Sequence, residues 1–220
     1  MSSNTSFRNT IPELLRQGAQ VGRSHYEPMM GESLYGIRNG AYVMNLEKTE
    51  TNLRRSAQFL HAVSAQKGNV LFVDPNHSSR KLTIAAAQAC NQHVLAHSWT
   101  GGFLTNGHSV YREVNLYHQL QHHSYTYQGN LPQYRRMKNR CSGLKPWFTK
   151  PDVLVLVHSE SCRVAIAEAQ ALDIPVIGIV DAHESPQGIT YPVPGNSKSL
   201  RFIHHCLNVW TKALQASLES

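Results

Sequence analysis

Four residues that could exchange protons lie where short apolar runs of the chain end, namely Asp74, His158, Asp181 and His183. A carboxylate beside an imidazole can serve as a general acid and base. If the apolar runs are parallel strands, their carboxyl ends share one edge of a sheet, where doubly wound folds bind ligands. One hypothesis is therefore an enzyme acting on a phosphorylated sugar or nucleotide through Asp74, His158 or Asp181. The alternative is that these residues only cap strand ends.

The loops that follow the apolar runs lack the motifs that would strengthen the enzyme hypothesis. The run at 70–74 leads into DPNHSSR, which has no glycine to let the backbone approach a pyrophosphate. A dinucleotide fingerprint, a P-loop lysine motif and a nucleophile elbow are all missing from the sequence. We therefore expect no catalytic residues, no cofactor and no small-molecule substrate.

The 13 histidines raise the question of a metal site. His122 and His123 are adjacent, as are His204 and His205, whereas two ligands on one helical face need a spacing of four. The four cysteines are far apart and form no short-spaced pair. We expect no metal ion and no disulfide framework.

Short β-branched runs at 70–74, 153–158 and 176–181 predict buried parallel strands, with a fourth strand at 94–98. Helical spacing or alanine-rich composition predicts helices at 46–67, which would stop at Gly68, and at 78–91, 161–172 and 197–217. Asn39-Gly40 between apolar flanks predicts a β-hairpin over 35–45. Alternating strands and helices predict an α/β fold with a three-layer, doubly wound parallel sheet.

Residues 108–150 interrupt this pattern with helical fragments broken by Gly129, Pro132, Gly143 and Pro146. Of the formal net charge of +7, most lies here, because residues 111–150 hold seven Lys and Arg and one acidic residue. Clustered cations favour a polyanion partner, although a solvated loop is the alternative. We predict an α/β sheet domain formed by 1–107 and 151–220, with 108–150 inserted as a basic helical protrusion outside the core.

No run of the chain approaches the ~20 apolar residues that cross a membrane, so we expect no membrane partner. Several segments resemble the ribosomal protein S2 family in order and spacing. They are LLRQGAQVGR (14–23), YGIRNGAYVMNLEKT (35–49), NVLFVD (69–74), SWTGGFLTN (98–106), KPDVLVLV (150–157), IPVIGIVD (174–181) and ITYPVPGN (189–196).

The resemblance implies a flavodoxin-like sheet domain, docked on small-subunit rRNA beside neighbouring ribosomal proteins, with no catalytic residues. Messenger RNA nearby stays an open alternative, as does a free-standing regulatory RNA-binding protein. For Arg38 a surface ion pair, and for Trp99 a core anchor, are the alternatives to an RNA contact. From the resemblance and the charge together we predict rRNA contacts at Arg23, His25, Arg38, Asn39, Gly101, Gly102, Asn106, Arg112, Arg135, Arg136, Lys138, Arg140, Lys145 and Lys150.

The chain also departs from the family pattern. The family's Gly-x-His-Phe-Gly-His segment has Gln20 and Arg23 in place of both histidines, and the acidic pair usual after Pro-Gly-Asn is Ser197-Lys198. The middle segment lacks the regular heptads of the family's coiled-coil hairpin, which indicates a basic arm that folds on binding RNA. These departures and the many histidines favour a mitochondrial ribosome, with a plastid or bacterial source as alternatives.

Overall fold

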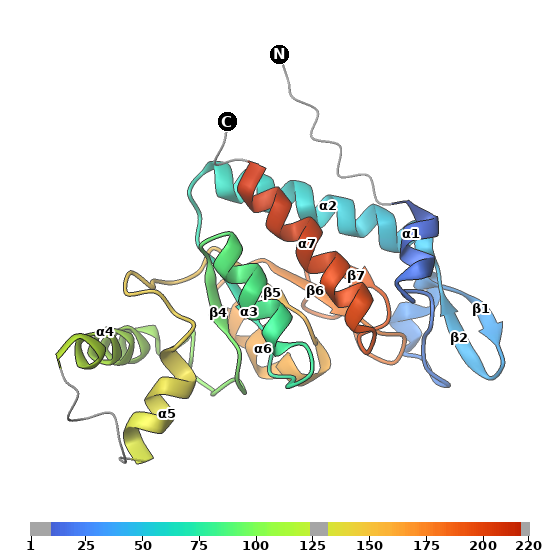
Figure 1. The fold of residues 1–220 in the computed structure, drawn as a ribbon. Coiled ribbons are helices and arrows are strands. Elements are labelled where there is room, and N and C mark those ends of the chain that lie inside the picture. The colour runs from blue at the N-terminus through green and yellow to red at the C-terminus, as the bar shows by residue number, and fades with distance from the viewer. Residues whose placement is uncertain (1–9, 124–131, 217–220) are drawn as a thin grey trace.

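A computed structural model describes residues 10–123 and 132–216 (Figure 1). Within these residues no helix is both long enough and apolar enough to cross a membrane. In chain order the elements are α1 (Ile11–Arg16), η1 (Pro28–Ser33), β1 (Leu34–Arg38), β2 (Ala41–Met44), α2 (Leu46–Ala65), β3 (Val70–Val73), α3 (Arg80–Ala89), β4 (His93–Leu95), α4 (Gly107–His123), α5 (Pro132–Cys141), β5 (Val153–Leu156), η2 (Glu160–Cys162), α6 (Arg163–Ala171), β6 (Val176–Val180), β7 (Tyr191–Pro194) and α7 (Leu200–Ala216).

Five parallel strands form the central sheet in the order β4-β3-β5-β6-β7. Counted along the chain this is 2-1-3-4-5, the order of flavodoxin-like folds. The order reverses between β3 and β5, so the crevice that binds ligands in such folds would open at the carboxyl ends of these two strands. The predicted fold class is confirmed.

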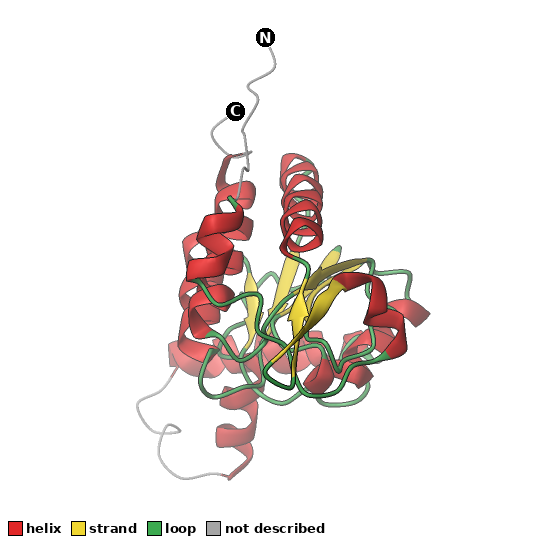
Figure 2. Ribbon diagram, turned by 90° about the vertical axis from the view of Figure 1, so that its right-hand side faces the viewer, coloured by secondary structure: helices red, strands yellow, loops and turns green. Residues whose placement is uncertain are grey.

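Helices cover both faces of the sheet, giving three layers (Figure 2). Val70 and Phe72 point to one side and pack against α2, α3 and α7, where Trp210 is fully buried. Leu71 and Val73 point to the other side and pack against α6 and α4. Neighbouring residues of β3 therefore serve two separate cores, as expected for strands buried on both faces.

The second helix shows how local sequence sets its ends. Asn45 caps it, because the Asn45 Oδ1 accepts the backbone N–H groups of Glu47 and Lys48 at 3.0 and 3.5 Å. The helix ends at Ala65, and Lys67, not Gly68, takes the left-handed conformation with φ of 58°. Gly68 serves a different purpose from the one predicted, since a Cβ there would lie 2.6 Å from Val63 Cγ1.

The sequence analysis missed β7, the fifth strand, because prolines at 192 and 194 argue against a strand. They are tolerated because β7 lies at the sheet edge and pairs only with β6. Side chains of α2 meet its free carbonyls: the Thr49 hydroxyl donates to the Pro194 oxygen at 2.8 Å and the Asn52 amide to the Pro192 oxygen at 2.9 Å.

The predicted hairpin is confirmed as the antiparallel pair of β1 and β2. Asn39 and Gly40 form its turn with φ angles of 52° and 75°, the positive values that a two-residue turn of this kind requires. In Figure 1 the hairpin tip lies at the end of the molecule opposite α4 and α5.

The segment with α4 and α5 contributes to the core, contrary to the expectation that it lies outside. Val110, Val114 and Tyr117 of α4 are buried in the second cluster, as are Leu144 and Phe148 after α5. The segment also protects the sheet edge, because the Val94 backbone N–H donates to the Gly143 oxygen at 2.9 Å. The broken helical pattern concealed this apolar stripe.

Gly143 is the tightest point of this edge contact, since a Cβ there would lie 2.1 Å from the Val94 oxygen. We expect Gly143→Ala to lower the free energy of unfolding by about 2 kcal/mol, because backbone has to move to make room. Gly36→Ala is the control, since a Cβ at Gly36 meets nothing within 4 Å. Chemical denaturation measures both variants, and equal stabilities would show that the edge contact is not close.

Candidate nucleic-acid interface

The polar residues at the ends of β3 and β5 come together, as the sequence predicts, but they bond to one another. The Thr83 hydroxyl donates to Asp74 Oδ2 at 2.6 Å, and Ser79 Oγ lies 2.9 Å from His158 Nε2. Asp74 is fully buried and His158 is 8% exposed. Burial lowers the pKa of His158 more than the Asp74 charge raises it, so the imidazole is neutral at physiological pH. These groups therefore bond to one another at the ends of β3 and β5, where the strand order of the sheet reverses.

A second polar cluster follows β6 and is also internally bonded. Ser197 Oγ donates to Asp181 Oδ2 at 3.1 Å, and Ser159 donates to Glu184 Oε2. Burial raises the pKa of Glu184, and the nearby Asp181 charge acts in the same direction. Arg23 supplies a cation, with its Nε 3.5 Å from Asp181 Oδ2. Arg23 thus points inward, and its ion pair competes with the phosphate contact predicted for it.

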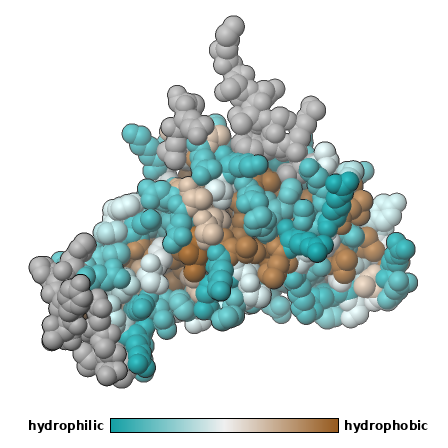
Figure 3. Space-filling model, viewed as in Figure 1, coloured by the Kyte–Doolittle hydropathy of each residue, from teal (hydrophilic) through white to brown (hydrophobic). Residues whose placement is uncertain are grey.

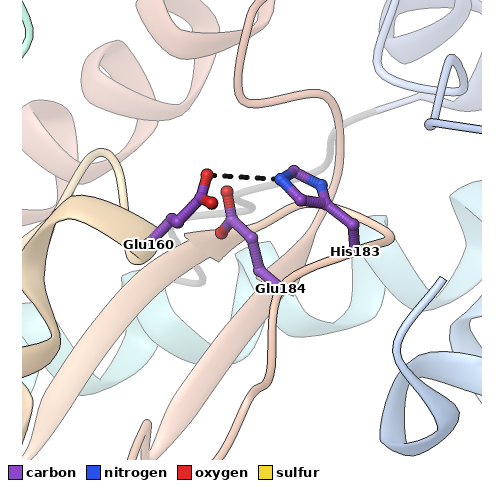
Figure 4. Close-up of side chains that lie close together, drawn as sticks. All are labelled: Glu160, His183 and Glu184. Atoms are coloured by element: carbon purple, nitrogen blue, oxygen red, sulfur yellow. Dashed lines mark hydrogen bonds and ion pairs between the residues drawn. The ribbon is translucent and has the colours of Figure 1, made fainter. Parts of the chain in front are cut away.

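Glu160, His183 and Glu184 place three potential metal ligands within 4.8 Å of one another (Figure 4). His183 Nε2 lies 3.2 Å from Glu160 Oε2. Both oxygens of Glu184 already accept hydrogen bonds, Oε1 from Ser197 and Oε2 from Ser159 and the Asp181 backbone. A metal ion would have to displace these donors, so we assign none to the cluster.

A buried carboxylate of α6 organises the loop with the SWTGGFLTN motif. Glu168, which is 8% exposed, accepts hydrogen bonds at Oε1 from the Trp99 indole (3.1 Å) and the Gly102 N–H (2.8 Å). Its Oε2 accepts from the backbone N–H groups of Leu104 (2.9 Å) and Thr105 (3.2 Å). Gly102 adopts a φ of 84°, which its missing Cβ makes easy. One carboxylate therefore holds the whole turn that precedes α4.

Burial alone would raise the pKa of Glu168, but the hydrogen bonds from Trp99, Leu104, Thr105 and Gly102 outweigh it and hold the pKa below its ordinary value. The ionised carboxylate is thus the form that the folded protein stabilises. Sequence analysis missed Glu168, although helical spacing places it on the buried face with Ala165 and Ala169. Trp99 takes the alternative role of a core anchor, because it packs against the second core cluster with its ring centroid 4.8 Å from that of Phe103.

The remaining predicted contact residues do not form one continuous site. Arg38 and Asn39 are exposed at the hairpin tip, and His25 is exposed with its ring 5.5 Å from that of His183. Gly101 and Asn106 are exposed on the loop held by Glu168. Figure 1 shows the hairpin and α5 at opposite ends of the molecule, so these residues offer at least two separate contact areas.

The densest basic area lies on α5 and beside it. Arg135, Arg136 and Lys138 are exposed, as is Arg112 on α4, and Figure 3 shows hydrophilic residues along α5. Arg140 is less available, because its Nη1 lies 2.9 Å from Glu113 Oε2. A hollow of about 550 Å³ separates α5 from the loop held by Glu168, lined by His97, Ser98, Thr100, Glu113, Arg136, Asn139 and Arg140. This basic hollow is the best candidate for a phosphate contact.

Comparison with known proteins adds an independent finding. Residues 14–217 match the family model described as ribosomal protein S2. The protein named small ribosomal subunit protein uS2 of Paramagnetospirillum magneticum is 29% identical over 96% of this chain and 84% of its own length. The proteins of the same name from Shewanella denitrificans and Acidiphilium cryptum are each 30% identical, over 96% and 88% of this chain and 90% and 80% of their own lengths.

We expect Glu168→Gln to lower the free energy of unfolding by about 3 kcal/mol at pH 7, since an amide offers one acceptor oxygen where the carboxylate offers two. A depressed carboxyl pKa contributes stability that is present above the ordinary value of 4.5 and lost as the pH falls through the folded-state pKa. The difference between variant and parent should therefore shrink in acid. Denaturation at pH 7 and pH 4 measures it, with Glu47→Gln as control, since Glu47 is exposed and forms no ion pair within the described residues; a difference independent of pH would contradict the assignment.

Proposed function

The chain belongs to the ribosomal protein S2 family, and from this premise we propose that it is a structural constituent of the small ribosomal subunit that binds rRNA and neighbouring ribosomal proteins during translation. The observation that carries the proposal is the extent of the family match, which runs from residue 14 to residue 217. The match includes the sheet, residues 108–150 and α7, so the similarity is not confined to a common sheet motif.

A scaffold without catalysis fits the strand ends of the sheet. The residues that an enzyme would use, Asp74, His158 and Asp181, are buried and hydrogen-bonded to Thr83, Ser79 and Ser197. A general acid or base must reach its substrate within hydrogen-bonding distance. These side chains instead stabilise the turns that leave the strands, and the names of the relatives give the enzyme alternative no support.

The rRNA contact is proposed to centre on residues 108–150, inserted between the two parts of the sheet domain, 1–107 and 151–220. Arg135, Arg136 and Lys138 are exposed on one short helix, and Arg136 also lines the basic hollow. Cations on a helix neutralise phosphates at any base sequence, so affinity would come from counterion release. The proposed contact also includes the loop residues Gly101, Gly102 and Asn106, with Arg112, Lys145 and Lys150 of the inserted segment.

The hairpin tip is proposed as a second, smaller rRNA contact. Arg38 and Asn39 are exposed there, and within the described residues no carboxylate forms an ion pair with Arg38. A guanidinium on a tight turn can present two parallel donors to phosphate oxygens.

We propose a mitochondrial small subunit as the location. The support is the departures from the family pattern at Gln20, Arg23 and Ser197, together with the 13 histidines of the chain. Immunodetection in density gradients of mitochondrial and cytosolic extracts tests the location. Co-migration with mitochondrial small subunits is expected, and detection with cytosolic or plastid subunits alone would exclude it.

Replacing Arg135, Arg136 and Lys138 together by Ala should flatten the dependence of rRNA binding on salt. Each lost phosphate contact lowers the slope of log K against log salt by roughly 0.7 to 0.9, so three contacts lower it by about 2. Arg140 is left in place because it pairs with Glu113. Filter binding to small-subunit rRNA over a range of potassium concentrations measures the slope.

The matched control replaces Arg54, Arg55 and Lys81, which are exposed on α2 and α3, by Ala. It removes the same charge from α2 and α3, outside residues 108–150, so a general loss of net charge would affect both triple variants equally. Equal slopes for the α5 variant and the parent would refute the contact on α5. If both triple variants lowered the slope equally, the loss of net charge, and not a contact on α5, would explain the change.

A further inference from the structure

Trp147 is the one tryptophan of the chain with a largely exposed side chain, at 54%, whereas Trp210 is fully buried and Trp99 is half-buried. It lies on the turn that links α5 to β5, in the sequence Lys145-Pro146-Trp147-Phe148. An indole offers a large flat face whose burial against another ring is favourable. The proposed rRNA contacts on α5 and at the hairpin tip do not involve this side chain.

The turn holds Trp147 in place from both sides. Phe148 is buried and stacks edge-on against His93, with ring centroids 5.0 Å apart. The Lys145 backbone N–H donates to His93 Nδ1 at 3.2 Å, and the Phe148 N–H donates to the Lys145 oxygen at 2.9 Å. Burial, and then the Lys145 charge, lower the pKa of His93 to about 4, so Nδ1 remains an acceptor at physiological pH. The indole is therefore presented on a fixed turn.

Trp147 lies in a long stretch of sequence whose charged residues are all basic. Between Glu113 and Asp152 the sequence contains no acidic residue. The Lys145 ammonium lies 5.9 Å from the centre of the Trp147 ring, and Lys150 follows three residues later. An exposed aromatic face beside a lysine is the combination that single-stranded nucleic acids bind, with the base on the ring and the phosphate on the cation.

We propose that Trp147 is a stacking platform for one unpaired nucleobase of RNA, with Lys145 contacting the adjacent phosphate. The inference rests on the proposed RNA-binding function and adds the kind of RNA bound at this position. Bases in a duplex are already stacked on their neighbours, so we expect the base to come from unpaired nucleotides of a loop, a bulge or a single-stranded tail. A protein partner is disfavoured because the nearby cations would need acidic residues to match them.

The test uses the full chain with a 12-nucleotide oligo(A) strand and an A-form duplex of equal length, monitored by tryptophan fluorescence and by binding. Oligo(A) should quench the emission of the parent protein, and the duplex should not. Trp147→Ala should abolish the quenching and weaken oligo(A) binding roughly tenfold or more, without changing the salt slope, because the residue is uncharged. Trp147→Phe should retain most of the affinity and lose the quenching.

Val164→Ala is the matched control, since Val164 is 55% exposed on α6, outside residues 108–150, and its loss should leave both readouts unchanged. Should Trp147→Ala misfold, quenching of the parent and the affinity of Trp147→Phe still decide the question. Salt-dependent RNA binding without quenching, or equal quenching by the duplex, would overturn the stacking platform and leave the proposed function intact. Absence of binding to oligo(A), the duplex and small-subunit rRNA alike would overturn both.

Discussion

The buried carboxylate of Glu168 constrains the part of the molecule from which the basic segment extends. An ionised group at 8% exposure is tolerated only with several donors, and here the backbone of residues 102–105 and the Trp99 indole supply them. Because these donors converge on one carboxylate, the chain after β4 forms one defined turn. Because α4 begins at Gly107, directly after this turn, the carboxylate also sets where α4 starts and where α5 can pack against it.

The polar groups at the strand ends of the sheet and the cations of α5 differ in whether they have partners within the protein. At the carboxyl ends of β3, β5 and β6 the polar groups hydrogen-bond to one another, and Arg23 forms an ion pair with Asp181 of the acidic cluster. On α5 the cations Arg135, Arg136 and Lys138 are exposed to solvent. Charge that is left free on the surface is charge available to a partner. The polar groups where doubly wound enzymes bind ligands are therefore bonded within the fold, whereas the cations of the inserted segment are left for the proposed rRNA contact.

Sequence analysis predicted the elements whose signals are local. The β-branched runs of β3, β5 and β6, the Asn39-Gly40 turn and the alanine-rich α3 and α6 lie within a few residues of their predicted bounds. It missed β7, because tolerance of prolines depends on the strand being at an edge and on α2 side chains meeting its carbonyls. It placed α4 outside the core, because the apolar stripe Val110, Val114 and Tyr117 is interleaved with polar residues.

For the candidate site, the sequence predicted which cations are exposed better than it predicted what each residue contacts. The exposed positions of Arg38, Arg135, Arg136 and Lys138 follow from charge, whereas the inward turn of Arg23 and the pairing of Arg140 with Glu113 depend on contacts between distant segments. Glu168 and Trp147 were missed for a related reason. A glutamate in a helix and a tryptophan in a loop are ordinary in sequence, and only burial of the first and exposure of the second indicate what they do.

If a parallel-sheet scaffold carries a basic segment that binds RNA phosphates, a reconstruction of the native small ribosomal subunit should show it, since the density reveals what each surface of the chain contacts. We expect α5 and the basic hollow to lie against the sugar-phosphate backbone of rRNA, with no ligand at the strand ends of the sheet. A subunit that lacks the chain, or a chain whose α5 faces solvent while a small molecule occupies the strand ends, would contradict it.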